Sequence, residues 1–138
     1  MAYDERYFIS RDGLKLYFRD YPSASARTPV LCLPGVTRNS RDFDWIADRI
    51  AATRRVLTMD MRGRGRSAYD PTPSNYLVPV ETLDVFEMLR IAGVPRVIVL
   101  GTSRGGIIAM AMAAAESSSV AAAILNDIRS DEHTSELQ

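Results

Sequence analysis

The segment Val97–Gly106, with the sequence VIVLGTSRGG, decides the fold of this chain. It joins a continuous apolar run to the pattern GxSxG, and a stretch rich in Ala, Met and Ile follows it. Such a run is typical of a strand buried on both faces, and such a stretch suits a helix packed against a sheet. The pattern GxSxG carries meaning where a strand turns sharply into a helix, which its flanks predict here. Gly101 and Gly105 then leave room for a strained turn that exposes the hydroxyl of Ser103, and Gly106 is expected to let the helix approach the sheet.

Three further apolar runs repeat the pattern of a buried strand: Val30–Leu33, Val56–Met59 and Val120–Leu125. Apolar residues at helical spacing lie between the runs, around residues 43–50, 83–91 and 105–116. The last run contains three alanines, which favour helix as readily as strand, but the serines at 117–119 break the preceding helix. This alternation predicts an α/β fold with a mostly parallel sheet and right-handed crossovers.

Local signals mark the ends of other predicted elements. The Asp-Gly pair at residues 12–13 separates two alternating segments, Tyr7–Ser10 and Leu14–Arg19, and predicts a hairpin of antiparallel strands. Gly93 is placed to end the helix around residues 83–91. In the helix around residues 43–50, Phe43 and Trp45 are interpreted as packing residues rather than as a substrate platform.

The composition predicts one globular domain. The chain has 138 residues, with 46% hydrophobic and 25% charged residues, which fits one domain and excludes disordered and fibrous classes. Seventeen basic residues balance seventeen acidic ones, so the charge favours neither nucleic acid nor an anionic membrane as a partner. The longest apolar run, Ile107–Ala115, is too short to span a bilayer, and the amino terminus lacks a signal-peptide pattern, so we expect a cytoplasmic location.

The lone cysteine and the Arg/Gly-rich segment receive structural interpretations. Cys32 lies between two leucines in an apolar run, which predicts a small buried side chain rather than a reactive thiol. The spacing of Gly63 and Gly65 fits no phosphate-binding loop, so a structural loop is expected there. Asp60, at the end of a predicted strand, is interpreted as a carboxylate that orders this loop rather than as a catalytic acid.

Three segments in this order resemble the amino-terminal half of an α/β-hydrolase. They are LPGVTRNSRDF at residues 33–43, DMRGRGRS at residues 60–67, which fits the family pattern DxRGxGxS, and GTSRGG at residues 101–106. The resemblance extends from about Tyr7 to Ile128. It implies an incomplete sheet of the α/β-hydrolase type, comprising about strands 1–6 with the intervening helices.

The resemblance also implies an activity and its residues. Ser103 would be the nucleophile, and the backbone amides of Val36 and Arg104 would form the oxyanion hole. A serine at this position disfavours the dehalogenase and epoxide-hydrolase relatives, which place an aspartate there. The implied substrate is a small ester, a thioester or a carbon–carbon bond next to a carbonyl, with neither metal nor cofactor. The alternative is a non-catalytic protein of the same fold that binds a small molecule, such as a receptor.

The sequence that follows these segments differs from the family pattern. The family's general base is a histidine far downstream, whereas the one histidine of this chain, His133, lies in a polar stretch without periodicity. Residues 129–138 resemble a translated sequencing adapter, so we interpret residues 1–128 as a truncated hydrolase domain and 129–138 as a non-native tail. His133 is then not expected to act as the base, Asp127 is a possible triad acid, and the chain alone is expected to be inactive.

Overall fold

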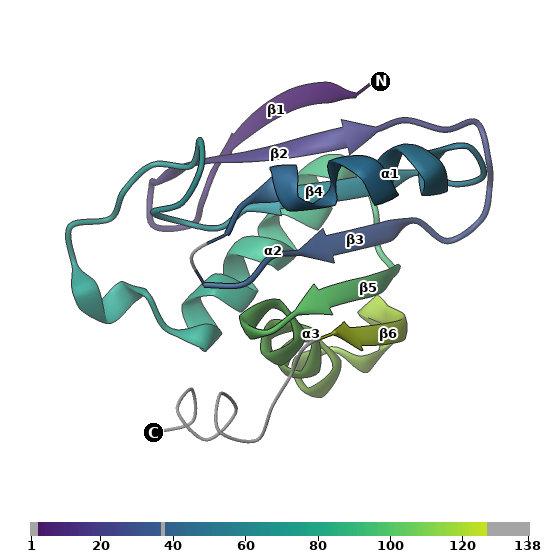
Figure 1. Ribbon diagram of the computed structural model, residues 1–138. Coiled ribbons are helices and arrows are strands. Elements are labelled where there is room, and N and C mark those ends of the chain that lie inside the picture. Colours follow the sequence, from purple (N-terminus) through teal and green to yellow (C-terminus); the bar gives the residue numbers. More distant parts are fainter. Residues whose placement is uncertain (1–2, 37, 127–138) are drawn as a thin grey trace.

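A computed structural model describes residues 3–36 and 38–126, which form one six-stranded sheet with helices on both faces (Figure 1). The strands are β1 (Asp4–Ile9), β2 (Lys15–Tyr21), β3 (Val30–Leu33), β4 (Val56–Asp60), β5 (Val97–Thr102) and β6 (Val120–Asn126). The helices are α1 (Asp44–Ala51), α2 (Val78–Ala92) and α3 (Arg104–Ala115). Short 3₁₀ turns lie at Ser40–Phe43, Pro73–Asn75 and Ser117–Ser119.

The sheet order is β1-β2-β4-β3-β5-β6. The first two strands form the predicted antiparallel hairpin, and β3, β4, β5 and β6 run parallel to one another. The chain moves from β3 outward to β4 and then returns past β3 to β5, so the direction of winding reverses between β3 and β5. In open α/β sheets, ligands bind at such a reversal, outside the carboxyl ends of the strands.

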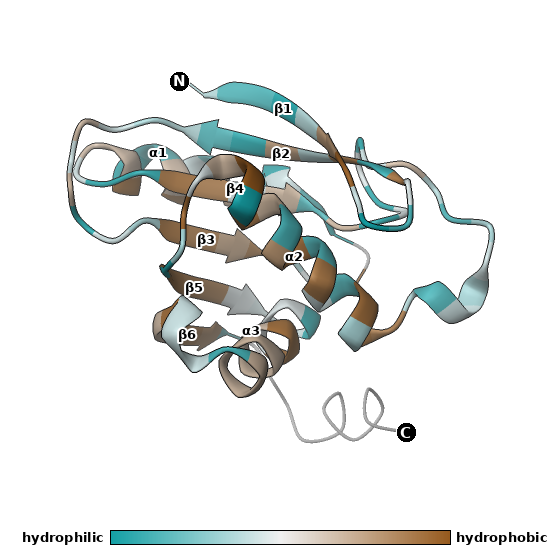
Figure 2. Cartoon of the chain, turned by 180° about the vertical axis from the view of Figure 1, so that it is seen from behind, coloured by the Kyte–Doolittle hydropathy of each residue, from teal (hydrophilic) through white to brown (hydrophobic). Residues whose placement is uncertain are grey.

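Alternate residues of the buried strands face two separate cores. Leu31 and Leu33 of β3 belong to a core with the apolar faces of α2 and α3, which cover one side of the sheet (Figure 2). Val30 and Cys32 point to the other side, where Ala47 of α1 packs against them. This two-sided burial explains why β3 reads as a continuous apolar run rather than as an alternating one.

The structure confirms the predicted fold class and most element boundaries. Gly93 ends α2 in the left-handed conformation, with φ of 72°, and its N–H donates to the carbonyls of the last turn. The interpretation of Phe43 as a packing residue is confirmed, since it is buried in the core, whereas that of Trp45 is wrong, because this residue is 67% exposed. Most of β6 is exposed rather than buried, since it is the edge strand among the described residues. No helix within residues 3–36 and 38–126 is long and apolar enough to cross a membrane.

Candidate active site

The turn from β5 into α3 holds Ser103 in a strained conformation. Its φ of 55° and ψ of −115° make it the one residue other than glycine with positive φ in the described part of the chain. Such backbone strain costs about 1–3 kcal/mol and persists where the surrounding structure enforces it. Here the Ser103 N–H donates to the carbonyl of Asn126 at 3.0 Å, and the Ser103 carbonyl accepts from Gly106 at 2.9 Å. The predicted strained turn is therefore present, with a half-buried serine at its apex.

Two glycines make this turn sterically possible. A Cβ on Gly101 would lie 2.6 Å from the carbonyl oxygen of Gly105, within the turn itself. A Cβ on Gly105 would lie 2.1 Å from the carbonyl oxygen of Leu33. Both distances are shorter than any real Cβ contact, and the opposing atoms belong to the backbone. Gly105 is thus the residue that allows α3 to approach β3 closely.

The loop after β3 packs directly against Ser103. A Cβ on Gly35 would lie 3.7 Å from the Ser103 Cβ and 3.7 Å from the Thr102 carbonyl oxygen, which is ordinary contact distance. Val36 follows in this loop and is 39% exposed. Because β3 and β5 are neighbouring parallel strands, their carboxyl ends meet at this point, with Leu33 opposite Gly101 (Figure 1). The loop and the serine turn therefore flank the point where the winding of the sheet reverses.

This arrangement can stabilise negative charge beside the serine hydroxyl. The first N–H groups of a helix have no acceptor within the helix, and α3 begins at Arg104, directly after Ser103. The N–H of Val36 belongs to the loop that packs on the same serine, and it donates to no acceptor among the described residues. Val36, in the loop that packs on this serine, and Arg104, the first residue of α3, thus belong to two different elements next to Ser103.

Asp60 orders the loop after β4, as the sequence predicts. Its Oδ1 accepts from the Ser40 N–H at 2.6 Å, and its Oδ2 accepts from the Arg66 N–H at 2.9 Å. Gly65, with φ of 54°, lies so close that a Cβ there would be 2.1 Å from the Asp60 Oδ2. Each oxygen of this carboxylate therefore accepts a backbone N–H from a different loop, which holds the two loops together.

A buried arginine next to this loop was not singled out from the sequence. Arg62 is 1% exposed and forms ion pairs with Asp70 at 2.9 Å, Asp84 at 2.7 Å and Asp12 at 2.9 Å. The hydrogen bond from Arg62 lowers the pKa of Asp12 to about 2. The cluster joins the β1–β2 turn, the loop after β4 and helix α2. Its sequence signal, three aspartates spread over the chain, is indistinguishable from surface charge.

Arg104 carries a second unforeseen contact. A cation in the first turn of α3 opposes the helix dipole, a cost of a few tenths of a kcal/mol or about 1 kcal/mol at most. In the structure, the Nε of this side chain donates to Glu81 Oε1 at 2.8 Å. Glu81 is fully buried near the start of α2. The charge on Arg104 is therefore balanced by a carboxylate from a neighbouring helix.

Cys32 is buried, as the sequence predicts, and burial disfavours the reactive thiolate form. Its side chain has no exposed surface, and burial raises the pKa of its thiol to about 12. Only the thiolate reacts with alkylating agents, so iodoacetamide at neutral pH should leave Cys32 unmodified in the folded protein and modify it in denaturant. Mass spectrometry of the two samples checks this. Rapid modification without denaturant would contradict the burial.

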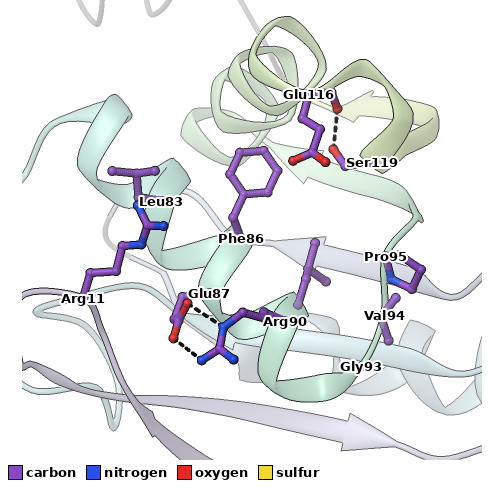
Figure 3. Close-up of a pocket in the computed structure, with 11 residues that line it drawn as sticks. Arg11, Leu83, Phe86, Glu87, Arg90, Gly93, Val94, Pro95, Glu116 and Ser119 are labelled. Carbon is purple, nitrogen blue, oxygen red and sulfur yellow. Dashed lines mark hydrogen bonds and ion pairs between the residues drawn. The ribbon is translucent and has the colours of Figure 1, made fainter.

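A hollow of about 630 Å³ lies at the opposite end of β5 from Ser103 (Figure 3). Val94 and Pro95, which precede β5, line one wall, and Phe86 of α2 points into the space between α2 and the end of α3. The ion pair of Glu87 with Arg90 borders it on the solvent side. β5 has six residues, so about 20 Å of strand separates this hollow from the serine turn. It is not part of the candidate active site.

Asp127 and His133 lie outside the described residues, as does the predicted tail at 129–138. The two predictions on these residues, a possible triad acid and a histidine without catalytic role, stay predictions. Within residues 3–36 and 38–126, no cluster of histidine, cysteine, aspartate or glutamate could hold a metal ion.

The sequence of this chain was compared with those of known protein families and proteins. The family model described as alpha/beta hydrolase fold matches residues 28–138. A 3-hydroxybutyrate-oligomer hydrolase of Cupriavidus necator is 33% identical over 121 residues, which cover 87% of this chain and 41% of that protein.

Solved structures of hydrolases are also similar to this chain. The crystal structure of an alpha/beta hydrolase from Novosphingobium aromaticivorans is 47% identical with a TM-score of 0.88, and the match covers 94% of this chain and 46% of that one. An esterase from Exiguobacterium antarcticum is 27% identical with a TM-score of 0.78, covering 88% and 44% of the two chains. This chain thus spans less than half of the length of these relatives.

Proposed function

The chain belongs to the α/β-hydrolase fold family, and on that premise we propose that it is part of a serine hydrolase with Ser103 as the nucleophile. One observation carries the proposal: Ser103 alone among the described non-glycine residues has positive φ, at the turn where β5 passes into α3. Strain of this kind is retained at functional sites, where it lifts a side chain out of the regular structure.

The proposed reaction is acyl transfer through an ester of Ser103. The Ser103 Oγ attacks the carbonyl carbon of the substrate as a general base takes the hydroxyl proton. The backbone N–H groups of Val36 and Arg104 hold the resulting oxyanion, and each such donor contributes about 3 kcal/mol to lowering the barrier. The leaving group departs with the proton, and water then cleaves the acyl-enzyme. We expect the general base to be a histidine other than His133.

Carboxylic esters are the first substrates to test. One relative is named as a hydrolase of 3-hydroxybutyrate oligomers, whose units are joined by ester bonds, and a similar solved structure is of an esterase. A serine at the apex of the turn suits this acyl chemistry. Thioesters and carbon–carbon bonds next to a carbonyl involve the same oxyanion and form the second group of candidate substrates.

A fluorophosphonate probe tests the proposal on the full-length protein that contains residues 1–128. Because the probe forms a covalent bond with an activated serine, we expect one label, on the peptide that contains Ser103. Mass spectrometry locates the label, and the Ser103→Ala protein serves as the control. Binding of a small ligand without labelling would instead support a receptor of the same fold.

A further inference from the structure

A buried carboxylate contacts Arg104 and, through Arg64, is connected to Val36, the two residues of the candidate oxyanion hole. Glu81, in the first turns of α2, has no exposed surface. Its Oε1 accepts from Arg104 Nε at 2.8 Å, and its Oε2 accepts from Arg64 Nη1 at 2.9 Å. Each carboxylate oxygen thus holds a different guanidinium, and the two arginines come from different segments of the chain.

Arg64 connects this carboxylate to the loop after β3. Its Nε donates to the carbonyl oxygen of Val36 at 2.8 Å, and its Nη1 also donates to the Arg62 carbonyl at 3.1 Å. The guanidinium is rigid and planar, so its contact with Glu81 fixes the direction of its contact with Val36. The residue that supplies one candidate oxyanion donor is therefore held through its own carbonyl group.

Arg104 connects the same carboxylate to the second donor. Its guanidinium is almost fully buried, and its Nη2 donates to the Tyr76 carbonyl at 3.0 Å. The backbone N–H of Arg104 is the other candidate donor of the oxyanion hole. One carboxylate thus links both residues whose amides flank Ser103, although these residues lie on separate elements.

We propose that Glu81 is a positioning residue that sets the distance between the Val36 and Arg104 amides. This inference rests on the proposed serine-hydrolase function and adds a residue that does not touch the substrate. An oxyanion hole works only when its donors are fixed before the reaction, and displacement by about 1 Å can reduce the rate by about 100-fold. Without the carboxylate, the buried Arg104 and the partly exposed Arg64 lose their common partner and move apart, and the amides move with them.

The competing explanation is that Glu81 only stabilises the fold, and the chain offers a matched control for it. Asp84 lies three residues further along α2, is 3% exposed, and accepts two hydrogen bonds from Arg62, each at 2.7 Å. It is also a buried carboxylate paired with arginine, but its hydrogen bonds come from Arg62 rather than from Arg64 or Arg104. Asp84→Asn therefore measures the cost of removing a buried charge from α2 without disturbing the amides.

The experiment compares Glu81→Gln with Asp84→Asn in the full-length protein that contains residues 1–128. The measurements are kcat and KM for a p-nitrophenyl ester, and the inhibition constant of a boronic acid, whose tetrahedral adduct places an oxygen in the oxyanion hole. We expect Glu81→Gln to lower kcat by about 10- to 100-fold, to weaken boronic acid binding by a similar factor, and to leave KM within about threefold. Asp84→Asn should lower the melting temperature but leave kcat within about threefold.

Arg64→Gln provides a second variant if Glu81→Gln does not fold. Arg64 is partly exposed, so its loss is better tolerated, yet it removes the link to the Val36 carbonyl. We expect the same fall in kcat with little change in KM. Since both residues act through one chain of contacts, the double variant should be no slower than the slower single variant, within about threefold.

Three results would overturn the inference: unchanged kcat in Glu81→Gln and Arg64→Gln, an equal fall of kcat in Asp84→Asn, or effects that multiply in the double variant. These outcomes are distinct from failure of the proposed function. If Ser103→Ala keeps the ester activity, the hydrolase proposal itself is wrong. If Ser103→Ala is inactive while the Glu81 and Arg64 variants are normal, only the positioning role is wrong.

Discussion

Replacing Ser103 with alanine is expected to lower kcat/KM for an ester substrate by about 10⁴-fold or more in the protein that carries this chain. The alanine keeps the Cβ and the backbone conformation but removes the oxygen that attacks the carbonyl. The remaining amide donors can still bind the substrate, so KM should change little. Steady-state kinetics on a p-nitrophenyl ester, together with loss of fluorophosphonate labelling, checks the result.

Ser67→Ala is the matched control for this substitution. Ser67 is 8% exposed, and its hydroxyl accepts from the Tyr17 N–H at 2.9 Å and donates to the Asp60 carbonyl, so its role is structural. Its loss should reduce the free energy of unfolding by about 1–3 kcal/mol and leave kcat within a few-fold. Similar activity losses in both variants would argue against a specific role for Ser103.

At position 103, stability and activity should favour different residues. A side chain at φ of 55° and ψ of −115° is strained, whereas glycine adopts this conformation without a Cβ clash. Ser103→Gly should therefore be inactive and yet raise the free energy of unfolding by about 1 kcal/mol. Chemical denaturation of this variant beside Ser103→Ala separates the strain from the chemistry.

Gly105→Ala is expected to reduce the free energy of unfolding by about 3 kcal/mol or more. The new Cβ would lie 2.1 Å from the Leu33 carbonyl oxygen, and neither backbone segment can rotate away. Helix α3 would have to move off β3, which would carry Ser103 with it and open contacts in the core. The measurement is the denaturation midpoint, with residual ester activity as a second readout.

Gly35→Ala is the control for a glycine in the same region. Its Cβ would meet no atom closer than 3.7 Å, so the free energy of unfolding should change by less than about 1 kcal/mol. Equal destabilisation by the two substitutions would show that loss of glycine flexibility, rather than the clash with Leu33, is responsible.

The order of the elements could be predicted because its signals are local. The run at Val30–Leu33 coincides with β3, and the Asp-Gly pair at residues 12–13 lies in the hairpin between β1 and β2. Periodicity and turn residues report on neighbours within a few positions, which is the range that a single sequence reveals. The same holds for the GxSxG turn, since Gly101 is crowded by its own turn.

Contacts between segments far apart in the sequence could not be predicted, because no local pattern indicates them. Glu81 looks like an ordinary acidic residue near the start of a helix, yet it is fully buried between two arginines. Trp45 occurs in an amphipathic helix but faces solvent. Burial of a charge depends on which segments fold over it, and pairing partners 17 and 23 residues away leave no periodic pattern.

By itself the sequence determined a parallel α/β sheet and the turn that carries Ser103, because strand, turn and helix are specified by adjacent residues. Only the tertiary structure decided that the β3 loop packs on that serine and that Glu81 links the two residues beside it. The physical reason is that these contacts arise where the winding of the sheet reverses between β3 and β5. There, residues far apart in the chain meet at the carboxyl ends of neighbouring strands.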